Sequence, residues 1–282
     1  MARVAALYDV HGNPAALEAV LAEAGEATLV FGGDLAAGPV PAETLDRIRE
    51  LVGPSNTVLQ APHGSAEAAR GEAASRSDEA SNTLLLASGS ALAIRGNADR
   101  ELLGGPGGGL VDEWVLAQLD EPQREFLAAL PETVQLDVAG VGRVLFCHGS
   151  PRGDEEMILR TTPDEWLRDM LEGVRADVVV CGHTHMQFDR TVDGIRVVNA
   201  GSVGLAYGGP GAHWLELGPD VVLRQTAYDQ EAFADRVTAS DWPEAARFAE
   251  ENIRNHPSEE EALAFFEPIA EQQRDERYPG SK

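Results

Sequence analysis

The order of apolar and polar residues predicts that the chain opens with two strand and helix units. Residues 4–8 form an apolar run that ends in polar residues, and residues 14–24 then follow a helical pattern with proline in the first turn. Residues 28–31 and 41–52 repeat this order, with a glycine-containing turn between them. The opening of the chain is therefore typical of an α/β fold.

Hairpins replace these units in the second half of the pattern. The dipeptide Asp193-Gly194 is a strong hairpin signal, and Gly140-Val141-Gly142 separates an earlier pair of apolar runs. The remaining predicted strands are residues 91–94, 134–138, 143–146, 188–192, 195–198, 214–217 and 221–225 and a run that starts at Val178, and the remaining predicted helices are residues 121–130 and 162–173. This order predicts two sheets that pack together and are covered by helices.

Two long segments depart from the pattern of short strands and helices. Residues 53–90 are rich in Ala, Ser, Gly and Glu with little periodicity, so we expect an irregular excursion. From residue 229 the chain becomes polar and helical, which predicts a main domain over residues 1–228 and a C-terminal helical extension over residues 229–282. Apolar residues of the extension can pack on the body or across a dimer, so the oligomeric state stays unknown at this stage.

The acidic composition argues against some classes of partner. The chain has 282 residues, with 47 Asp and Glu against 22 Lys and Arg, and a formal net charge of −25. This charge repels polyanions, so we expect neither nucleic acid nor a membrane as partner. No run approaches the ~20 apolar residues that span a bilayer. Because Cys147 and Cys181 make no disulfide framework, we expect a cytoplasmic protein.

Side chains that can bind a metal follow successive predicted strands. They are Asp9, His11, Asp34, Asn97, Asp99, His148, His183 and His185. His183 and His185 are two residues apart, so in an extended segment both rings point to the same side and can reach one site. Oxygen donors mixed with imidazoles suit Mn, Fe, Zn, Ni or Co, and this number of donors is enough for two ions that share a carboxylate.

Five short motifs in this order resemble those of the calcineurin-like metallophosphoesterases. They are Asp9-Val10-His11, Gly33-Asp34, Gly96-Asn97, His148-Gly149 and Gly182-His183-Thr184-His185. The run from Asp9 to Asn13 is most similar to the bacterial and archaeal branch of small phosphodiesterase-like members. The resemblance implies an α/β (α+β) fold, a four-layer αββα sandwich of two mixed β-sheets flanked by helices.

The same resemblance implies a dinuclear metal centre that hydrolyses phosphate esters. The implied ligands are Asp9, His11 and His185 for one divalent ion, Asn97, His148 and His183 for the other, and Asp34 as the bridge between them. A hydroxide shared by the two ions would attack the phosphorus of a small phosphate ester or nucleotide. The expected activity is that of a phosphodiesterase. Asp34, Asn97 and His148 are then the expected catalytic residues.

The chain departs from the family pattern directly after Asn97. Many relatives carry a histidine there that is thought to protonate the leaving group, whereas this chain has Ala98. We therefore expect esters with acidic leaving groups to be the better substrates, because they need less help from a general acid. His63 and Arg100 are weak candidates for the missing donor.

Several polar residues near the motifs have a structural interpretation beside a functional one. Asn13 can contact phosphate or cap the helix that begins at residue 14, and we prefer the cap. Asp99 can orient a ligand or form a surface ion pair with Arg100. Arg95 is expected at the surface.

The remaining histidines and the cysteines have structural readings. His213 is expected to pack within a strand, and His256 is expected to be exposed. Cys147 and Cys181 each neighbour a predicted ligand, but they lack CxxC spacing and are expected to be small buried apolar residues rather than zinc ligands.

Two other functions are open at the level of the sequence. A binding scaffold of the same fold would catalyse nothing, but relatives that resemble scaffolds have usually lost metal-binding histidines and this chain keeps all of them. A nuclease would need a basic groove hidden within the acidic charge, and its binding to single-stranded DNA would weaken steeply with salt. A metal-dependent phosphoesterase is the primary hypothesis.

Overall fold

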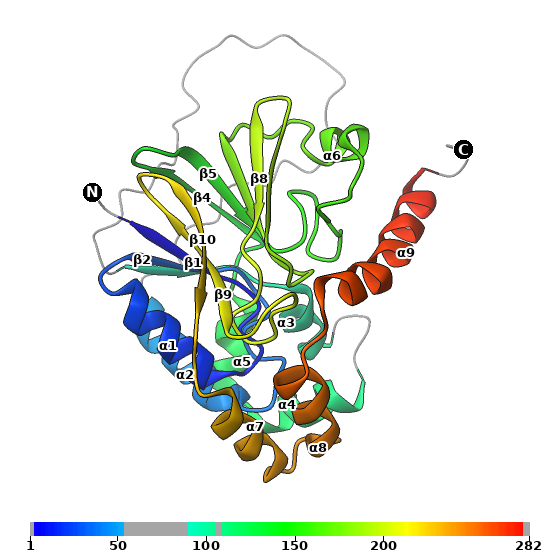
Figure 1. Ribbon diagram of the computed structural model, residues 1–282. Coiled ribbons are helices and arrows are strands. Elements are labelled where there is room, and N and C mark those ends of the chain that lie inside the picture. The colour runs from blue at the N-terminus through cyan, green and yellow to red at the C-terminus, as the bar shows by residue number, and fades with distance from the viewer. Residues whose placement is uncertain (1–2, 54–89, 105–108, 279–282) are drawn as a thin grey trace.

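Two five-stranded sheets pack face to face between layers of helices in the computed structural model, which describes residues 3–53, 90–104 and 109–278 (Figure 1). The predicted excursion at residues 53–90 lies outside the described residues except for its two ends. His63 and residues 105–108 also lie outside them. Within the described residues the fold is the predicted α/β sandwich of two mixed sheets.

The first sheet has the strand order β10-β9-β1-β2-β3. Its strands are β1 (Val4–Leu7), β2 (Thr28–Phe31), β3 (Ala91–Ala93), β9 (Ala212–Leu217) and β10 (Val221–Thr226). β1, β2 and β3 run parallel to one another, whereas β9 is antiparallel to β1 and to β10. The sheet is therefore mixed, and it joins the start of the chain to strands more than 200 residues later.

The second sheet has the strand order β4-β5-β6-β8-β7. Its strands are β4 (Thr133–Val138), β5 (Gly142–Cys147), β6 (Val178–Cys181), β7 (Phe188–Val192) and β8 (Ile195–Asn199). The two predicted hairpins are present as the antiparallel pairs β4 with β5 and β7 with β8, and β5, β6 and β8 are parallel.

Apolar side chains fill the space between the sheets and the space under the helices. Between the sheets, Val4, Ala6 and Leu215 of the first sheet pack with Phe146 and Val180 of the second. A second cluster lies between the first sheet and α1 (Pro14–Ala24), α2 (Pro41–Val52) and α5 (Glu121–Ala128), and a third lies under α6 (Asp164–Met170) on the second sheet. These clusters give the four-layer αββα order.

The predicted bounds are closest where the helix signals are strongest. α1, α2 and β2 begin and end at the predicted residues, because proline opens each helix and glycine follows it. α6 is shorter than the predicted residues 162–173 at both ends. α3 (Asn97–Leu102) and α4 (Leu110–Gln118) were not predicted, because α3 has only six residues and α4 has one buried side chain, so neither shows a helical apolar stripe.

The segment after residue 228 is helical, as predicted. It contains α7 (Gln230–Thr238), α8 (Ala245–Phe248), the π-helix η2 (Ala249–Arg254) and α9 (Glu259–Arg277). Phe233, Val237 and Trp242 belong to the same apolar cluster as α1 and α2, whereas Leu263 of α9 packs with Met157. The extension thus packs on the body of the chain. None of the described helices is long and apolar enough to cross a bilayer.

Candidate metal centre

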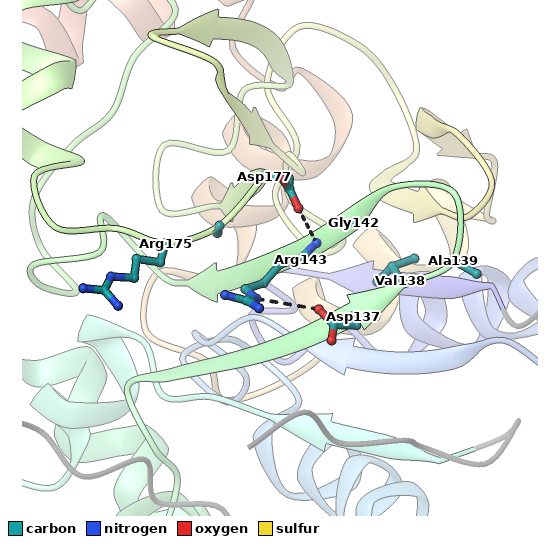
Figure 2. A pocket seen from close by; sticks show the side chains of 8 residues that line it. Asp137, Val138, Ala139, Gly142, Arg143, Arg175 and Asp177 are labelled. Atoms are coloured by element: carbon teal, nitrogen blue, oxygen red, sulfur yellow. Dashed lines mark hydrogen bonds and ion pairs between the residues drawn. The ribbon is translucent and has the colours of Figure 1, made fainter. Parts of the chain in front are cut away.

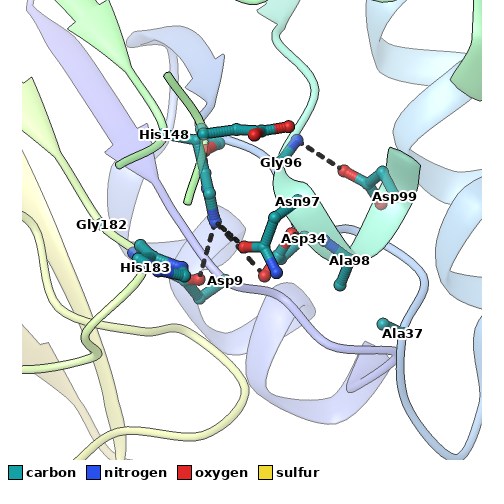
Figure 3. Close-up of polar contacts among 12 residues, drawn as sticks. Asp9, Asp34, Ala37, Gly96, Asn97, Ala98, Asp99, His148, Gly182 and His183 are labelled. Carbon is teal, nitrogen blue, oxygen red and sulfur yellow. Dashed lines mark hydrogen bonds and ion pairs between the residues drawn. The ribbon is translucent and has the colours of Figure 1, made fainter. Parts of the chain in front are cut away.

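The predicted ligands lie at the C-terminal ends of strands from both sheets. They are Asp9 and His11 after β1, Asp34 after β2, Asn97 at the start of α3 after β3, His148 after β5, and His183 and His185 after β6. The strands that carry them are parallel within each sheet, so the side chains meet at one edge of the sandwich. Figure 3 shows the part of this cluster around Asp34 and His148.

Six of the seven side chains form two groups whose potential ligand atoms lie within 4.8 Å of one another. One group is Asp9, His11 and His185, and the other is Asp34, His148 and His183. The carboxylate of Asp34 lies between the groups, since its Oδ2 is 3.8 Å from His11 Nε2 and 3.3 Å from His148 Nε2. This division is the one that the sequence predicts for two ions with Asp34 as the shared ligand.

Asn97, the seventh side chain, joins the second group through its amide oxygen. Asn97 Oδ1 lies 3.1 Å from His148 Nε2, and its Nδ2 faces Glu101 Oε1 at 3.5 Å. The oxygen of the amide therefore faces His148 (Figure 3), and the nitrogen faces Glu101.

Backbone carbonyl groups fix the orientation of three imidazole rings. The Nδ1 atoms of His11, His148 and His185 lie 2.9, 2.8 and 2.8 Å from the carbonyl oxygens of Ala37, Gly32 and Leu205. A carbonyl oxygen can only accept, so each Nδ1 must donate and therefore carries a hydrogen. A neutral ring in this orientation turns the lone pair of Nε2 toward the centre, which is the arrangement that metal-ligating histidines use.

The atoms that converge in the first group fit a cation. His11 Nε2 and His185 Nε2 are 3.0 Å apart, and Asp9 Oδ1 is 3.2 Å from His185 Nε2 without a hydrogen-bond partner. Both Nδ1 atoms donate to carbonyls, so in the neutral rings both Nε2 atoms are acceptors, as is Asp9 Oδ1. Acceptors this close repel one another unless positive charge lies between them. In the second group, the buried Nε2 of His183 likewise has no partner. The donor set thus fits divalent ions with mixed nitrogen and oxygen coordination.

The backbone at the centre adopts a conformation that most residues avoid. Asp9, His11, Asp34, His183 and His185 have φ values of 53°, 46°, 53°, 66° and 58°. Only two other non-glycine residues among those described, Asp193 and Glu244, have positive φ. Left-handed backbone at a non-glycine residue is costly and is often concentrated at functional sites. Five of the seven such residues lie in this one cluster, which indicates that the fold is built around it.

Glycines bring the backbone of each motif close to the carboxylates. A Cβ on Gly96 would lie 2.1 Å from Asp34 Oδ1, and one on Gly182 would lie 2.4 Å from Asp9 Oδ2. The φ of Gly182 is not positive, so this glycine is not required by a left-handed backbone. Gly182 is needed instead because the side chain of Asp9 occupies the space of a Cβ.

Comparison with known proteins agrees with this arrangement. A family profile described as the calcineurin-like phosphoesterase superfamily domain matches residues 71–216, which is more than half of the chain. The chain belongs to this superfamily. Its members are generally metal-dependent phosphoesterases, and the predicted recognition is confirmed. No curated protein matches the chain at a significant level.

Two solved structures have the same fold over most of their length. A metallophosphoesterase from Sphaerobacter thermophilus is 21% identical, with a TM-score of 0.62 over 87% of this chain and 96% of that one. A hypothetical protein from Pyrococcus horikoshii OT3 is 20% identical, with a TM-score of 0.65 over 88% of this chain and 98% of that one. At this identity the similarity extends to the fold alone.

Neighbouring imidazoles at the candidate centre lower the pKa of both central aspartates. Burial favours the neutral acid, but His148 next to Asp34, and His185 next to Asp9, hold the pKa of both carboxyls below the usual range. Burial also disfavours the charged form of His148, but the carboxylate of Asp34 outweighs it and raises the pKa of His148 to about 10. Burial and the charge of His148 lower the pKa of His183 to about 4.

Asp99 is buried and holds two motif loops together. Its Oδ1 accepts from the backbone N–H of Leu35 at 2.9 Å, and its Oδ2 accepts from the N–H of Gly96 at 3.1 Å. Burial and the nearby charge of Asp34 raise the pKa of Asp99 to about 7. The alternative of a surface ion pair with Arg100 is wrong, because the side chain of Asp99 has no exposed area.

Asn13 and Arg100 are engaged away from the centre. The Asn13 side chain caps α1 by accepting from Ala16 N at 3.0 Å, and its Nδ2 donates to Gly204 O and to Tyr228 Oη. Arg100 binds Asp154 and Glu155. Both side chains therefore have protein partners, and the cap interpretation of Asn13 agrees with the structure.

Two buried residues that support the histidine motif were not predicted. Asn199 donates to Gly182 O at 2.7 Å and to Thr184 Oγ1 at 3.1 Å, and Ser202 donates to Asp9 O at 2.8 Å. Asn199 is the last residue of β8 and Ser202 follows this strand. Neither belongs to one of the five motifs, so the sequence offers no signal for them beyond their position at the end of a strand.

Arginine, cysteine and histidine residues outside the centre pair with other side chains or are covered by the fold. Arg95 pairs with Glu132 at 3.3 Å, Cys147 and Cys181 are buried free thiols, and neither cysteine belongs to a metal-binding group within the described part of the chain. His213 is buried in β9, as expected. The prediction that His256 is exposed is wrong, because it is half-buried and its Nδ1 is covered.

A cavity lies at the end of the second sheet that is opposite the candidate centre. Its volume is about 720 Å³, and Asp137, Gly142, Arg143 and Asp177 are among the residues that line it (Figure 2). Arg143 and Asp177 stand where β5 and β6 begin, whereas His148 and His183 follow their other ends. None of the predicted ligands lines this cavity, so it has no part in the candidate centre.

Proposed function

We propose that this phosphoesterase is a phosphodiesterase that uses two divalent ions to hydrolyse a small phosphate ester. The convergence of carboxylate oxygens and imidazole Nε2 atoms around the carboxylate of Asp34 carries the proposal. Asp9, His11 and His185 would hold one ion, Asn97, His148 and His183 the other, and Asp34 both. When bound, the ions would supply Lewis acidity that activates water and offsets charge on the phosphoryl oxygens.

The protein's own groups hold this set of ligands in place. The backbone N–H of Ala98 donates to Asp34 Oδ1 at 2.9 Å, so the other oxygen of Asp34 is directed at the two histidines. The carbonyls on the Nδ1 atoms keep Nε2 unprotonated in the neutral rings. Because these partners are backbone groups, the ligands are oriented before substrate arrives.

Two observations support a diester rather than a monoester. Two cavities lie beside predicted ligands, one of about 510 Å³ that includes His11 and one of about 220 Å³ that includes His148, and a diester has two organic arms. Arg100 and Arg152 near the second cavity are paired with carboxylates. Their charge is therefore already offset, so a monoester dianion finds no free cation in them.

The residue at position 98 sets the preferred leaving group. Ala98 has no side-chain proton to give, so the leaving oxygen departs without help from that position. We therefore expect aryl diesters, whose leaving groups are acidic, to react faster than dialkyl diesters.

The first prediction tests Asp34. With added Mn²⁺, the purified protein should hydrolyse bis(4-nitrophenyl) phosphate, and Asp34→Asn should reduce turnover below detection because the amide cannot offset the charge of two ions. Asp193→Asn is the matched control, since Asp193 has a similar φ of 49° but lies in the β7 and β8 turn. Release of 4-nitrophenolate and metal content per chain are the measurements.

The outcomes separate the proposed function from the alternatives. Two ions per chain with no hydrolysis of mono- or diesters would favour the non-catalytic scaffold. Faster hydrolysis of 4-nitrophenyl phosphate than of the diester would contradict the phosphodiesterase assignment. Tight, salt-sensitive binding of single-stranded DNA would favour the nuclease, against which the net charge of −25 argues.

A further inference from the structure

The cavity at the His11 end of the centre is walled by the C-terminal helical segment. Its lining includes Leu110 and Val111 of α4, Leu205, Trp242, and Glu251 of η2, together with His11 itself. We call it the C-terminal cavity. Figure 1 places α4 and α8 near each other at the lower edge of the molecule, and this cavity lies between α4 and the segment around α8. A volume of about 510 Å³ is within the range of small-molecule sites.

The mouth of the C-terminal cavity exposes apolar side chains that folding alone would bury. Leu110 is 80% exposed and Val111 is 39% exposed. Among the described residues, the other exposed large apolar side chains are those of Val222, Leu223 and Phe265. Exposed apolar side chains that gather at a hollow next to a reactive centre are typical of a ligand site. Trp242 and Phe248, in edge contact with ring centroids 5.3 Å apart, form the opposite wall.

The backbone of the C-terminal wall is irregular where it meets the cavity. Ala249–Arg254 is a π-helix, and its residues Glu251 and Asn252 line the cavity. π-Helical turns are rare and frequently occur at functional sites. Glu244, which directly precedes α8 and also lines the cavity, has a left-handed φ of 57°. These two costly features are independent of the apolar lining and occur at the same wall.

The charges on this wall select against an anionic ligand. Glu244 and Glu251 both face Arg247, whose Nη2 is 2.5 Å from Glu244 Oε2 and whose Nε is 3.7 Å from Glu251 Oε2. One guanidinium between two carboxylates leaves a net negative charge. These side chains are 63–68% exposed, so solvent weakens the repulsion of an anion. The one cation among the described residues that line this cavity is already paired, so the wall favours an uncharged group.

We propose that the C-terminal cavity binds one arm of the phosphodiester substrate, and that this arm is an uncharged, largely apolar organic group such as an aryl ring. The phosphate would lie at the metal centre and the arm would extend past His11 between α4 and η2. This inference rests on the proposed function, because it places the phosphate at the candidate centre. It adds the chemical class of the substrate and assigns the C-terminal helical segment as its specificity element.

The test compares two diesters with the same leaving group. Phenyl 4-nitrophenyl phosphate and methyl 4-nitrophenyl phosphate differ in the second arm only. With Mn²⁺-loaded protein we expect kcat/KM to be about tenfold higher for the phenyl ester, and Leu110→Asp to remove most of this preference, because a charged side chain at the mouth no longer covers the ring. Leu223→Asp is the matched control on β10, and it should keep the preference.

A binding measurement makes the inference independent of turnover. Calorimetric titration of the Mn²⁺-loaded protein with diphenyl phosphate should give a Kd about tenfold lower than with dimethyl phosphate, and Leu110→Asp should reduce this difference. Diphenyl phosphate with a carboxylate on each ring should bind more weakly than the parent, and Glu251→Gln should recover part of the loss.

Different results overturn the inference and the proposed function. If both 4-nitrophenyl esters react with equal kcat/KM in the wild type and in Leu110→Asp, the C-terminal cavity does not bind the arm, although the enzyme is still a phosphodiesterase. If no ester reacts but diphenyl phosphate binds with the stated preference, the cavity assignment stands and the catalytic proposal fails. Equal Kd values for diphenyl and dimethyl phosphate contradict the cavity assignment whether or not the esters react.

Discussion

At the scale of single residues, burial and the attraction between carboxylates and imidazoles have opposite effects on the charges of the centre. Burial alone would neutralise Asp9, Asp34 and His148, but each carboxylate lies next to an imidazole and each imidazole next to a carboxylate. The result is a pair of ionised aspartates surrounded by nitrogen atoms whose direction is fixed by backbone carbonyls. Without a metal ion, a proton on His148 offsets the charge of Asp34.

The second prediction concerns that proton. The pKa of His148 is raised to about 10, so at pH 8 the ring is charged and an ion in the second group must displace its proton. Metal affinity should therefore rise with pH, by about tenfold per unit for one displaced proton, and level off near pH 10. Calorimetry of Mn²⁺ binding at pH 8 in two buffers of different ionisation enthalpy should detect about one released proton per chain.

The sign of the linked effect on folding is opposite. A histidine with a raised pKa stabilises the metal-free protein fully below the ordinary pKa near 6.5, and this contribution is lost as pH rises toward about 10. Saturating metal should remove this pH dependence. If Mn²⁺ binding at pH 8 releases no proton, the expectation that the ion displaces a proton from His148 is contradicted.

At the scale of elements, strand ends and the loops that follow them place the ligands. The N–H groups of Leu35 and Gly96 share the carboxylate of Asp99, which joins the loop after β2 to the start of α3. Asn199, the last residue of β8, holds the loop after β6 by donating to Gly182 O and Thr184 Oγ1. Because these loops also contain left-handed residues, their geometry depends on such cross-links and on close backbone approach.

The third prediction tests this close approach. Gly182→Ala should reduce metal content, because the new Cβ would lie 2.4 Å from Asp9 Oδ2 and must displace that carboxylate. Gly109→Ala is the matched control, since a Cβ there meets nothing within 4 Å. Metal bound per chain after dialysis is the measurement, and equal metal content in the two variants would show that Asp9 has room to move.

At the scale of the whole molecule, the C-terminal helices share the main apolar core. Phe233, Ala234 and Trp242 pack in the cluster that contains Leu17 of α1 and Leu45 of α2. The division at residues 228 and 229 therefore stays a prediction about sequence organisation, and the shared core suggests that both parts unfold together. This attachment would also hold the wall of the C-terminal cavity against the centre.

The fourth prediction follows from this shared core. Phe233→Ala should lower the free energy of unfolding by about 3–5 kcal/mol, because Phe233 is 3% exposed and its loss leaves a cavity under α7. Phe265→Ala, at a side chain that is 65% exposed on α9, should change it by about 0.5 kcal/mol or less. Denaturant unfolding followed by circular dichroism measures both, and a separate transition for the C-terminal helices would contradict the shared core.

The sequence alone determined what local chemistry dictates. The bounds of α1 and α2 follow from proline and glycine at their ends, and the hairpin at Asp193 follows from its turn residues. The predicted ligands follow from donor side chains placed after apolar strands and from the motifs that resemble the family. The sequence also shows that Ala98 stands where many relatives carry a histidine. These features depend on residues close to one another in the chain.

Only the tertiary structure decided which distant groups meet. Nothing near Asp99 in sequence indicates that it is buried against Leu35, and nothing near Gly182 indicates that Asp9 occupies the space beside it. The C-terminal cavity likewise joins His11 to residues more than 230 positions away. Such contacts arise because the core brings strands and helices together regardless of their order, so local patterns carry no information about them.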